Sequence, residues 1–134
     1  MNVYRISAVT LIISNMERSC NFYSQIPGWK LVYGGSCNDT FTTYEVGENI
    51  PTMSLNLELS RNNDNKKEFK RRHFGRIIFH TEDVDKLYSY LKNNERISNM
   101  IRFEDEPKNA TWGERYFHIF EPDGYQLSFA KPID

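Results

Sequence analysis

The sequence predicts an α+β fold built from two copies of one βαβββ module. Three observations predict this fold: short β-branched runs surround two amphipathic segments, the order of these elements occurs twice, and the strand residues alternate between an apolar and a mixed face. The 134 residues have the size of one domain. We therefore expect a single domain over residues 1–134, with module one at 1–60, a charged linker at 61–72 and module two at 73–134.

Module one begins with a β-branched, apolar run at residues 5–13, which predicts a strand. A helix should follow, because Ser14 or Asn15 can cap it and apolar residues recur at helical spacing up to Pro27-Gly28. Three further strands are expected, separated by turns rich in Gly, Ser and Asn, at residues 29–33, 40–46 and 52–59.

The segment at residues 61–72 (RNNDNKKEFKRR) is polar and highly charged, with one apolar residue. It is typical of a solvated linker. A nucleic-acid-binding patch is the alternative, but the segment lacks the interleaved aromatic residues and the known motif that such a patch would show.

Module two repeats the order of elements. A strand is expected at 76–80, then a helix that Asp83 caps and Asn93-Asn94 ends, and a tight turn at Glu121-Pro122-Asp123-Gly124. The remaining strands are predicted at residues 98–103, 115–121 and 126–130. A shift of 68 residues places Ala8 on Arg76, Asn15 on the cap Asp83 and Phe22 on Tyr90. Strand, cap and helix stripe then coincide, which indicates an internal duplication.

The strands have one apolar face and one mixed face, because neighbouring side chains point to opposite sides. The apolar face should pack on the helices and consists of Val9, Leu11, Ile13, Leu55, Leu57, Leu59, Ile77, Phe79, Phe117, Ile119, Leu127 and Phe129. The mixed face holds Ala8, Thr10, Ile12, Ser54, Asn56, Glu58, Arg76, Ile78, His80, Tyr116, His118, Phe120, Gln126, Ser128 and Ala130. This mixture favours the wall of a partly enclosed cavity over a fully solvated sheet face.

Composition and charge narrow the function classes. Hydrophobic residues make up 39%, charged residues 26%, and the net charge is −1. No strong field therefore recruits nucleic acid or an anionic membrane, and we expect neither as a partner. The N-terminus shows no signal-peptide pattern, apolar runs are short, and Cys20 and Cys37 are too few for a disulfide framework. We predict a cytoplasmic protein.

The duplicated order resembles the vicinal oxygen chelate superfamily, which includes glyoxalase I, extradiol dioxygenases and bleomycin resistance proteins. Three segments carry the resemblance: ISAVTLIISNMERSCNFYSQIPGWKLVY, IIFHTEDVDKLYSYL and WGERYFHIFEPDGYQLSFAKP. The resemblance implies that the mixed sheet curls around a central cleft with the helices on the outer face. It also implies a homodimer.

Metalloenzymes of this superfamily place His or Glu at positions that the resemblance carries to Ala8, Glu58, Arg76 and Ser128. Only Glu58 has a metal-binding group, and Arg76 is a permanent cation. The usual metal site is therefore expected to be absent, and we predict no cofactor. A displaced site at His80, His118 and Glu58 is the disfavoured alternative.

The favoured function is a metal-independent small-molecule-binding protein of the glyoxalase/bleomycin-resistance type. Arg76 would take the place of the metal ion, where it could pair with Glu58 and also receive an anionic group of the ligand. The other interpretation is that the Arg76–Glu58 pair is a purely structural clamp. Trp112, Tyr116 and Phe120 would offer an aromatic wall. The predicted ligand is small and anionic or aromatic, and the predicted contacts are Glu58, Arg76, His80, Trp112, Tyr116, His118 and Ser128.

An enzyme of the same superfamily remains open as the second function. It would be a lyase, isomerase or dioxygenase, either with the displaced metal or with metal-free acid–base chemistry by Glu58 and His118. A third possibility is a protein that acts only through a partner surface.

Overall fold

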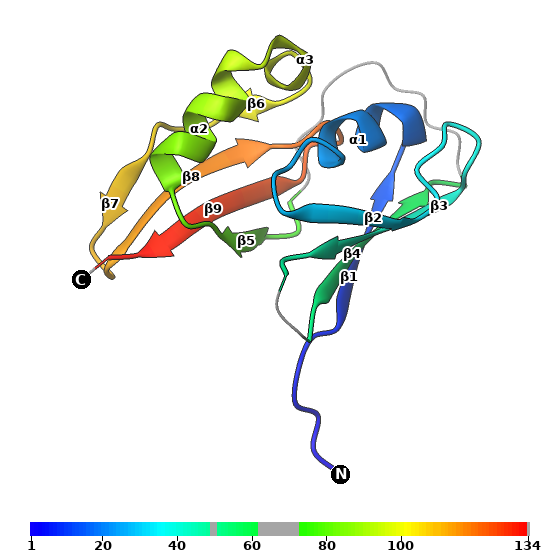
Figure 1. Ribbon diagram of the computed structural model, residues 1–134, viewed down its shortest axis with the longest axis horizontal. Coiled ribbons are helices and arrows are strands. Elements are labelled where there is room, and N and C mark those ends of the chain that lie inside the picture. Colours follow the sequence, from blue (N-terminus) through cyan, green and yellow to red (C-terminus); the bar gives the residue numbers. More distant parts are fainter. Residues whose placement is uncertain (49–50, 62–72, 134) are drawn as a thin grey trace. The chain divides into compact units, whose positions relative to one another are not determined.

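A computed structural model describes residues 1–48, 51–61 and 73–133 (Figure 1). The chain divides into two compact units, Met1–Lys67 and Glu68–Asp134. The first unit contains the predicted module one (1–60), and the second unit contains the predicted module two (73–134). The predicted linker, apart from Arg61, lies outside the described residues. The single domain and its cleft stay predictions.

Module one is a four-stranded mixed sheet with one helix. Its elements are β1 (Ala8–Ile13), α1 (Met16–Tyr23), β2 (Trp29–Tyr33), β3 (Phe41–Val46) and β4 (Met53–Leu59). The strand order is β1-β4-β3-β2, in which β1 and β4 are parallel and the other pairs are antiparallel. Of the two predicted cap residues, Asn15 caps α1, because its Oδ1 accepts a hydrogen bond of 2.9 Å from the Arg18 backbone N–H.

The core of module one combines the apolar sheet face with α1. Leu11, Ile13, Leu55 and Leu57 are buried, as the alternation predicted. Tyr23 at the end of α1 stacks on Trp29 of β2, with ring centroids 5.5 Å apart. Such packing fixes the helix against the sheet through the hydrophobic effect rather than through intrinsic helix propensity.

Module two is a five-stranded mixed sheet with two helices. Its elements are β5 (Arg76–His80), α2 (Val84–Asn93), α3 (Glu95–Ser98), β6 (Arg102–Phe103), β7 (Lys108–Ala110), β8 (Glu114–Phe120) and β9 (Gln126–Pro132). The order is β5-β9-β8-β6, β7 also pairs with β8, and β5 and β9 are parallel. Asp83 caps α2, whose side chains Val84, Leu87 and Leu91 are buried. Figure 1 shows α2 lying along β8.

The two sheets confirm the predicted duplication. In each module the first strand pairs in parallel with the last strand, and antiparallel strands follow. The first strands of the modules are related by the predicted shift of 68 residues and the last strands by a shift of 72, because Ala8 lies opposite Ser54 and Arg76 lies opposite Gln126. The α+β class and the two repeated modules are thus confirmed.

The structure corrects several predicted boundaries. The strand predicted at 98–103 is wrong: residues 95–98 form α3, and only Arg102–Phe103 pair with β8. Burial explains the difference, because a helical turn after Asn94 places Ile97 in the core. Strand β7 was not predicted, since its sequence Lys-Asn-Ala carries no β-branched residue. In module one, β1 begins at Ala8 rather than residue 5, and α1 ends at Tyr23, before Pro27.

Among the helices of the described residues, none combines the length and hydrophobicity needed to cross a membrane.

Candidate functional site

The mixed face of module two gathers the polar and aromatic side chains of three neighbouring strands. Period-two alternation and the strand register place them on one side of the sheet. They are Arg76, Ile78 and His80 of β5, Gln126, Ser128 and Ala130 of β9, and Glu114, Tyr116, His118 and Phe120 of β8. Five of the seven predicted contact residues therefore share this face, and Trp112 joins them through its ring contact with Tyr116.

An aromatic ladder runs along β8. The rings of Trp112 and Tyr116 stack with centroids 5.7 Å apart and planes 24° apart, and the Tyr116 ring lies 4.8 Å from the His118 ring. Trp112 is 69% exposed, so one face of its indole is open to solvent. An exposed, preordered ring of this kind can stack on a planar group.

The exposed indole makes one hydrogen bond to a glutamate that also lies close to His80. The Trp112 Nε1–H donates to Glu114 Oε1 at 3.3 Å, and His80 Nε2 lies 3.7 Å from Glu114 Oε2. His80 lies opposite the buried Ala130 of β9, whereas Glu114 lies opposite Pro132, two residues further along the same strand. The contact between His80 and Glu114 therefore joins β5 and β8 diagonally across β9.

The guanidinium of Arg76 is held by a buried amide. The Arg76 Nε–H donates to Gln126 Oε1 at 3.1 Å, and Gln126 Nε2 donates to Glu104 Oε2 at 2.5 Å. Gln126 is 6% exposed, whereas Arg76 is exposed. Among the residues that the structure describes, the two Nη groups of Arg76 have no hydrogen-bond or carboxylate partner.

His118 of β8 lies next to Tyr116 and close to Asp105. Asp105 Oδ1 accepts a hydrogen bond of 2.7 Å from the His118 backbone N–H, and Asp105 also pairs with Lys108 at 3.4 Å. The imidazole Nδ1 is shielded from solvent and has no partner among the described residues. Burial lowers the pKa of His118, Arg76 and Lys108 lower it further, and Asp105 and Glu104 oppose the shift.

Stability should therefore depend on the protonation of His118. A pKa that is lower in the folded than in the unfolded chain means that the unfolded chain binds more protons below the ordinary histidine pKa of about 6.5. We expect the free energy of unfolding to fall as the pH is lowered from 7.5 to 5.5, and to fall less for His118→Phe. Urea unfolding of both proteins at the two pH values measures this. Equal losses would show that His118 is not the group responsible.

Ser128 and Glu58 differ in their surroundings. Ser128 is 2% exposed, opposite His118 on β8 and Ile78 on β5. Glu58 lies in module one, exposed on β4 between Ile12 and Phe41. Its pairing with Arg76 would join the two modules and stays a prediction.

The register gives a different counterpart for Ser128 than the resemblance does. Ser128 follows the residue opposite Arg76 by two positions, and Asn56 follows the residue opposite Ala8 by two positions. By the duplication, Asn56 is therefore the counterpart of Ser128, and Glu58 is the counterpart of Ala130. The Asn56 amide is engaged within the sheet, where it accepts from Thr43 at 2.8 Å and donates to Thr10 at 3.2 Å.

The residues at the superfamily's metal positions do not fit a metal ion. Ala8 has no donor atom, Arg76 carries a fixed positive charge, and Ser128 offers a neutral hydroxyl. Over residues 1–48, 51–61 and 73–133, no three His, Cys, Asp or Glu side chains form a group that could hold a metal. His80 and His118 lie in module two and Glu58 lies in module one, so the displaced site stays a prediction.

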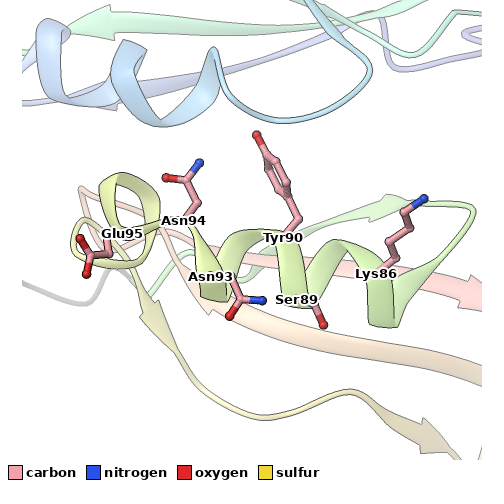
Figure 2. Close-up of a pocket in the computed structure, with 6 residues that line it drawn as sticks. All are labelled: Lys86, Ser89, Tyr90, Asn93, Asn94 and Glu95. Atoms are coloured by element: carbon pink, nitrogen blue, oxygen red, sulfur yellow. The ribbon is translucent and has the colours of Figure 1, made fainter.

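A separate hollow lies on the exposed side of α2 (Figure 2). It has a volume of about 880 Å³ and is lined by Lys86, Ser89, Tyr90, Asn93, Asn94 and Glu95. These side chains belong to one helix face and its continuation, and none is a predicted contact residue. The hollow lies open to solvent and holds no cluster of convergent groups, so the mixed sheet face remains the candidate site.

Four residues of this site were missed by sequence reasoning: Gln126 as a partner of Arg76, and Glu104, Asp105 and Lys108 beside His118. Gln126 was assigned to the mixed face, and its position opposite Arg76 follows from the duplication. Glu104, Asp105 and Lys108 carried no usable signal, because they follow the strand that was wrongly predicted.

The duplicated sheets, each opening with a parallel pair of first and last strands, define a paired βαβββ protein with a polar and aromatic face in module two. The Glyoxalase/Bleomycin resistance protein/Dioxygenase superfamily matches residues 5–129, and the chain belongs to this superfamily. The resemblance seen in the sequence is thereby confirmed.

Individual relatives agree with this membership. The chain is 27% identical over 128 residues to a lactoylglutathione lyase of Neisseria meningitidis serogroup A, covering 95% of this chain and 90% of the relative. A glyoxalase/bleomycin resistance protein/dioxygenase from Nocardioides matches with a TM-score of 0.68, at 17% identity over 100% of this chain and 87% of that chain. A glyoxalase-related enzyme from Fulvimarina pelagi matches with a TM-score of 0.69, at 19% identity over 96% of this chain and 88% of that chain. These two structures establish the fold alone.

Proposed function

We propose that the protein binds a small anionic or aromatic molecule on the mixed face of module two, without a metal ion. The observation that carries the proposal is Arg76. Its guanidinium is held at Nε by Gln126, and its two Nη groups have no partner among the described residues. A fixed cation at a position where relatives place a metal ligand is suited to receive an anion directly.

The other contacts follow from the geometry of the face. The open side of Trp112 would stack on a planar part of the ligand, and Tyr116 and His118 would continue the wall. His80 and Ser128 would contribute polar contacts, and Glu58 would reach the ligand from module one. Binding proteins of this type often work as homodimers, so we also propose a homodimer. The cytoplasmic location expected from the sequence is part of the same proposal.

A thermal-shift screen of small carboxylates, phosphates and aromatic molecules, run with and without a chelator, tests the proposal. A ligand that binds only the folded chain raises its stability by RT ln(1 + [L]/Kd), about 2.7 kcal/mol at a hundredfold excess over Kd. We expect at least one hit whose shift is the same in the presence of EDTA. A shift that EDTA removes would contradict metal independence, and the lack of any hit would contradict the binding function.

A second candidate function is favoured by the relative from Neisseria meningitidis, which is named a lactoylglutathione lyase. A lyase or isomerase on this scaffold would use metal-free acid–base chemistry, with the neutral imidazole of His118 as the base and Glu58 as its carboxylate partner. Turnover of lactoylglutathione by the purified protein, combined with metal analysis, separates the two functions. Turnover that requires stoichiometric Zn²⁺ or Ni²⁺ would support a metalloenzyme. It would contradict both the metal-independent binding protein and the metal-free enzyme.

A further inference from the structure

The buried amide of Gln126 separates a cation from an anion. Its Oε1 accepts from Arg76 and its Nε2 donates to Glu104, so both ends of the side chain are used. Gln126 is 6% exposed and lies opposite Arg76 in the parallel register of β5 and β9. The rotamer of Gln126 is therefore fixed by packing and by two hydrogen bonds.

This arrangement has a geometric consequence for Arg76. A guanidinium has five N–H donors in a planar fork. Because the Nε–H donates to Gln126, the edge that carries Nη1 and Nη2 is the one left to other partners. That edge matches the two oxygens of a carboxylate or the oxygens of a phosphate.

It also has an electrostatic consequence. The Glu104 carboxylate accepts from the amide of Gln126, and within the described part of the chain no carboxylate is paired with the guanidinium of Arg76. A direct carboxylate contact would neutralise Arg76 and occupy its fork. The neutral amide thus orients the guanidinium without neutralising its charge.

We infer that Gln126 is a positioning residue that makes Arg76 a receptor for a carboxylate or another oxyanion of the ligand. The inference rests on the proposed binding function and adds to it a chemical class for the bound group and a residue that sets the preference for anions. Gln126 acts through Arg76 and needs no contact with the ligand.

A charge swap between positions 126 and 104 tests this inference. The double variant Gln126→Glu with Glu104→Gln keeps the net charge and can keep both hydrogen bonds, but moves the carboxylate next to Arg76. Benzoate and its neutral analogue benzamide are titrated into the wild-type protein and the double variant, with binding followed by NMR. We expect the wild-type protein to bind benzoate at least tenfold more tightly than benzamide, and the double variant to lose this preference.

A second variant, measured without ligand, shows whether a loss of binding in the double variant comes from unfolding. Gln126→Met keeps the side-chain volume but removes the acceptor, so the Nε–H signal of Arg76, assigned through Arg76→Lys, should exchange faster with water than in the wild-type protein. Retention of the benzoate preference in the double variant, or unchanged exchange in Gln126→Met, would overturn the inference. Equal binding of both probes by the wild-type protein would overturn it too, while leaving the binding function standing. Binding of neither probe would also overturn it, and the binding function would then be decided by the thermal-shift screen.

Discussion

Replacement of Phe117 by alanine is expected to lower the free energy of unfolding by about 3–5 kcal/mol. Phe117 is fully buried on the apolar face of β8. The centroid of its ring lies 5.2 Å from that of Tyr88 in α2 and 5.4 Å from that of Phe129 in β9. Phe117 therefore joins the helix to two strands of module two. Truncation removes buried apolar surface and leaves a cavity that neighbouring rings cannot fill.

The neighbouring residue offers a matched control. Tyr116 lies on the opposite face of the same strand and is only partly buried, so Tyr116→Ala should cost far less stability and should instead weaken ligand binding. Urea unfolding monitored by circular dichroism measures both variants. Equal destabilisation by the two substitutions would contradict the assignment of one face to the core and the other to the site.

The alternation of β8 shows why much of the fold was predictable. Each strand residue faces either the helices or the opposite side, so the identities of Phe117 and Ile119 already reveal the core. The caps Asn15 and Asp83 were recognisable for a similar local reason, since a short polar side chain satisfies a free N–H at a helix start. Local chemistry decides these features, so one sequence is enough to predict them.

The segment between α2 and β8 was not predictable in the same way. Ile97 and Ile101 are buried, but a short apolar pattern fits a strand as well as a helical turn, and tertiary packing selected the turn. Errors there propagated into the site, because Glu104 and Asp105 directly follow this segment. Their contacts with Gln126 and His118 depend on strand pairing across 22 and 13 residues.

The predicted contact residues also divide into those that local periodicity placed correctly and those that required the strand pairing. Arg76, His80, Tyr116, His118 and Ser128 were placed on one face by periodicity alone, and the register agrees. The position equivalent to Ser128 in module one required the register of β1 and β4, which identifies Asn56. A shift of two residues keeps a side chain on the same face, so alternation by itself cannot separate Asn56 from Glu58.

Charge reversal at Arg76 is expected to have the largest effect on binding. Arg76→Glu should weaken the binding of any carboxylate ligand by at least about a hundredfold. Two hydrogen bonds to a charged group, each contributing about 1.5–3 kcal/mol, are lost, and every 1.4 kcal/mol corresponds to a factor of ten in Kd. The fold should tolerate the change, because Arg76 is exposed and its described partner is the neutral Gln126. Isothermal titration with the best carboxylate from the thermal-shift screen measures the loss.

Lys86→Glu provides the control for a change in net charge. It alters the charge of the chain by the same amount but lies on the exposed side of α2, away from the mixed sheet face. If long-range attraction alone drew anions to the protein, both variants would lose affinity to a similar extent, and added salt would remove the difference from the wild-type protein. A direct contact at Arg76 instead predicts that Lys86→Glu binds almost as tightly as the wild-type protein at 0.15 M salt. Comparable losses in the two variants would therefore exclude Arg76 as the residue that receives the ligand.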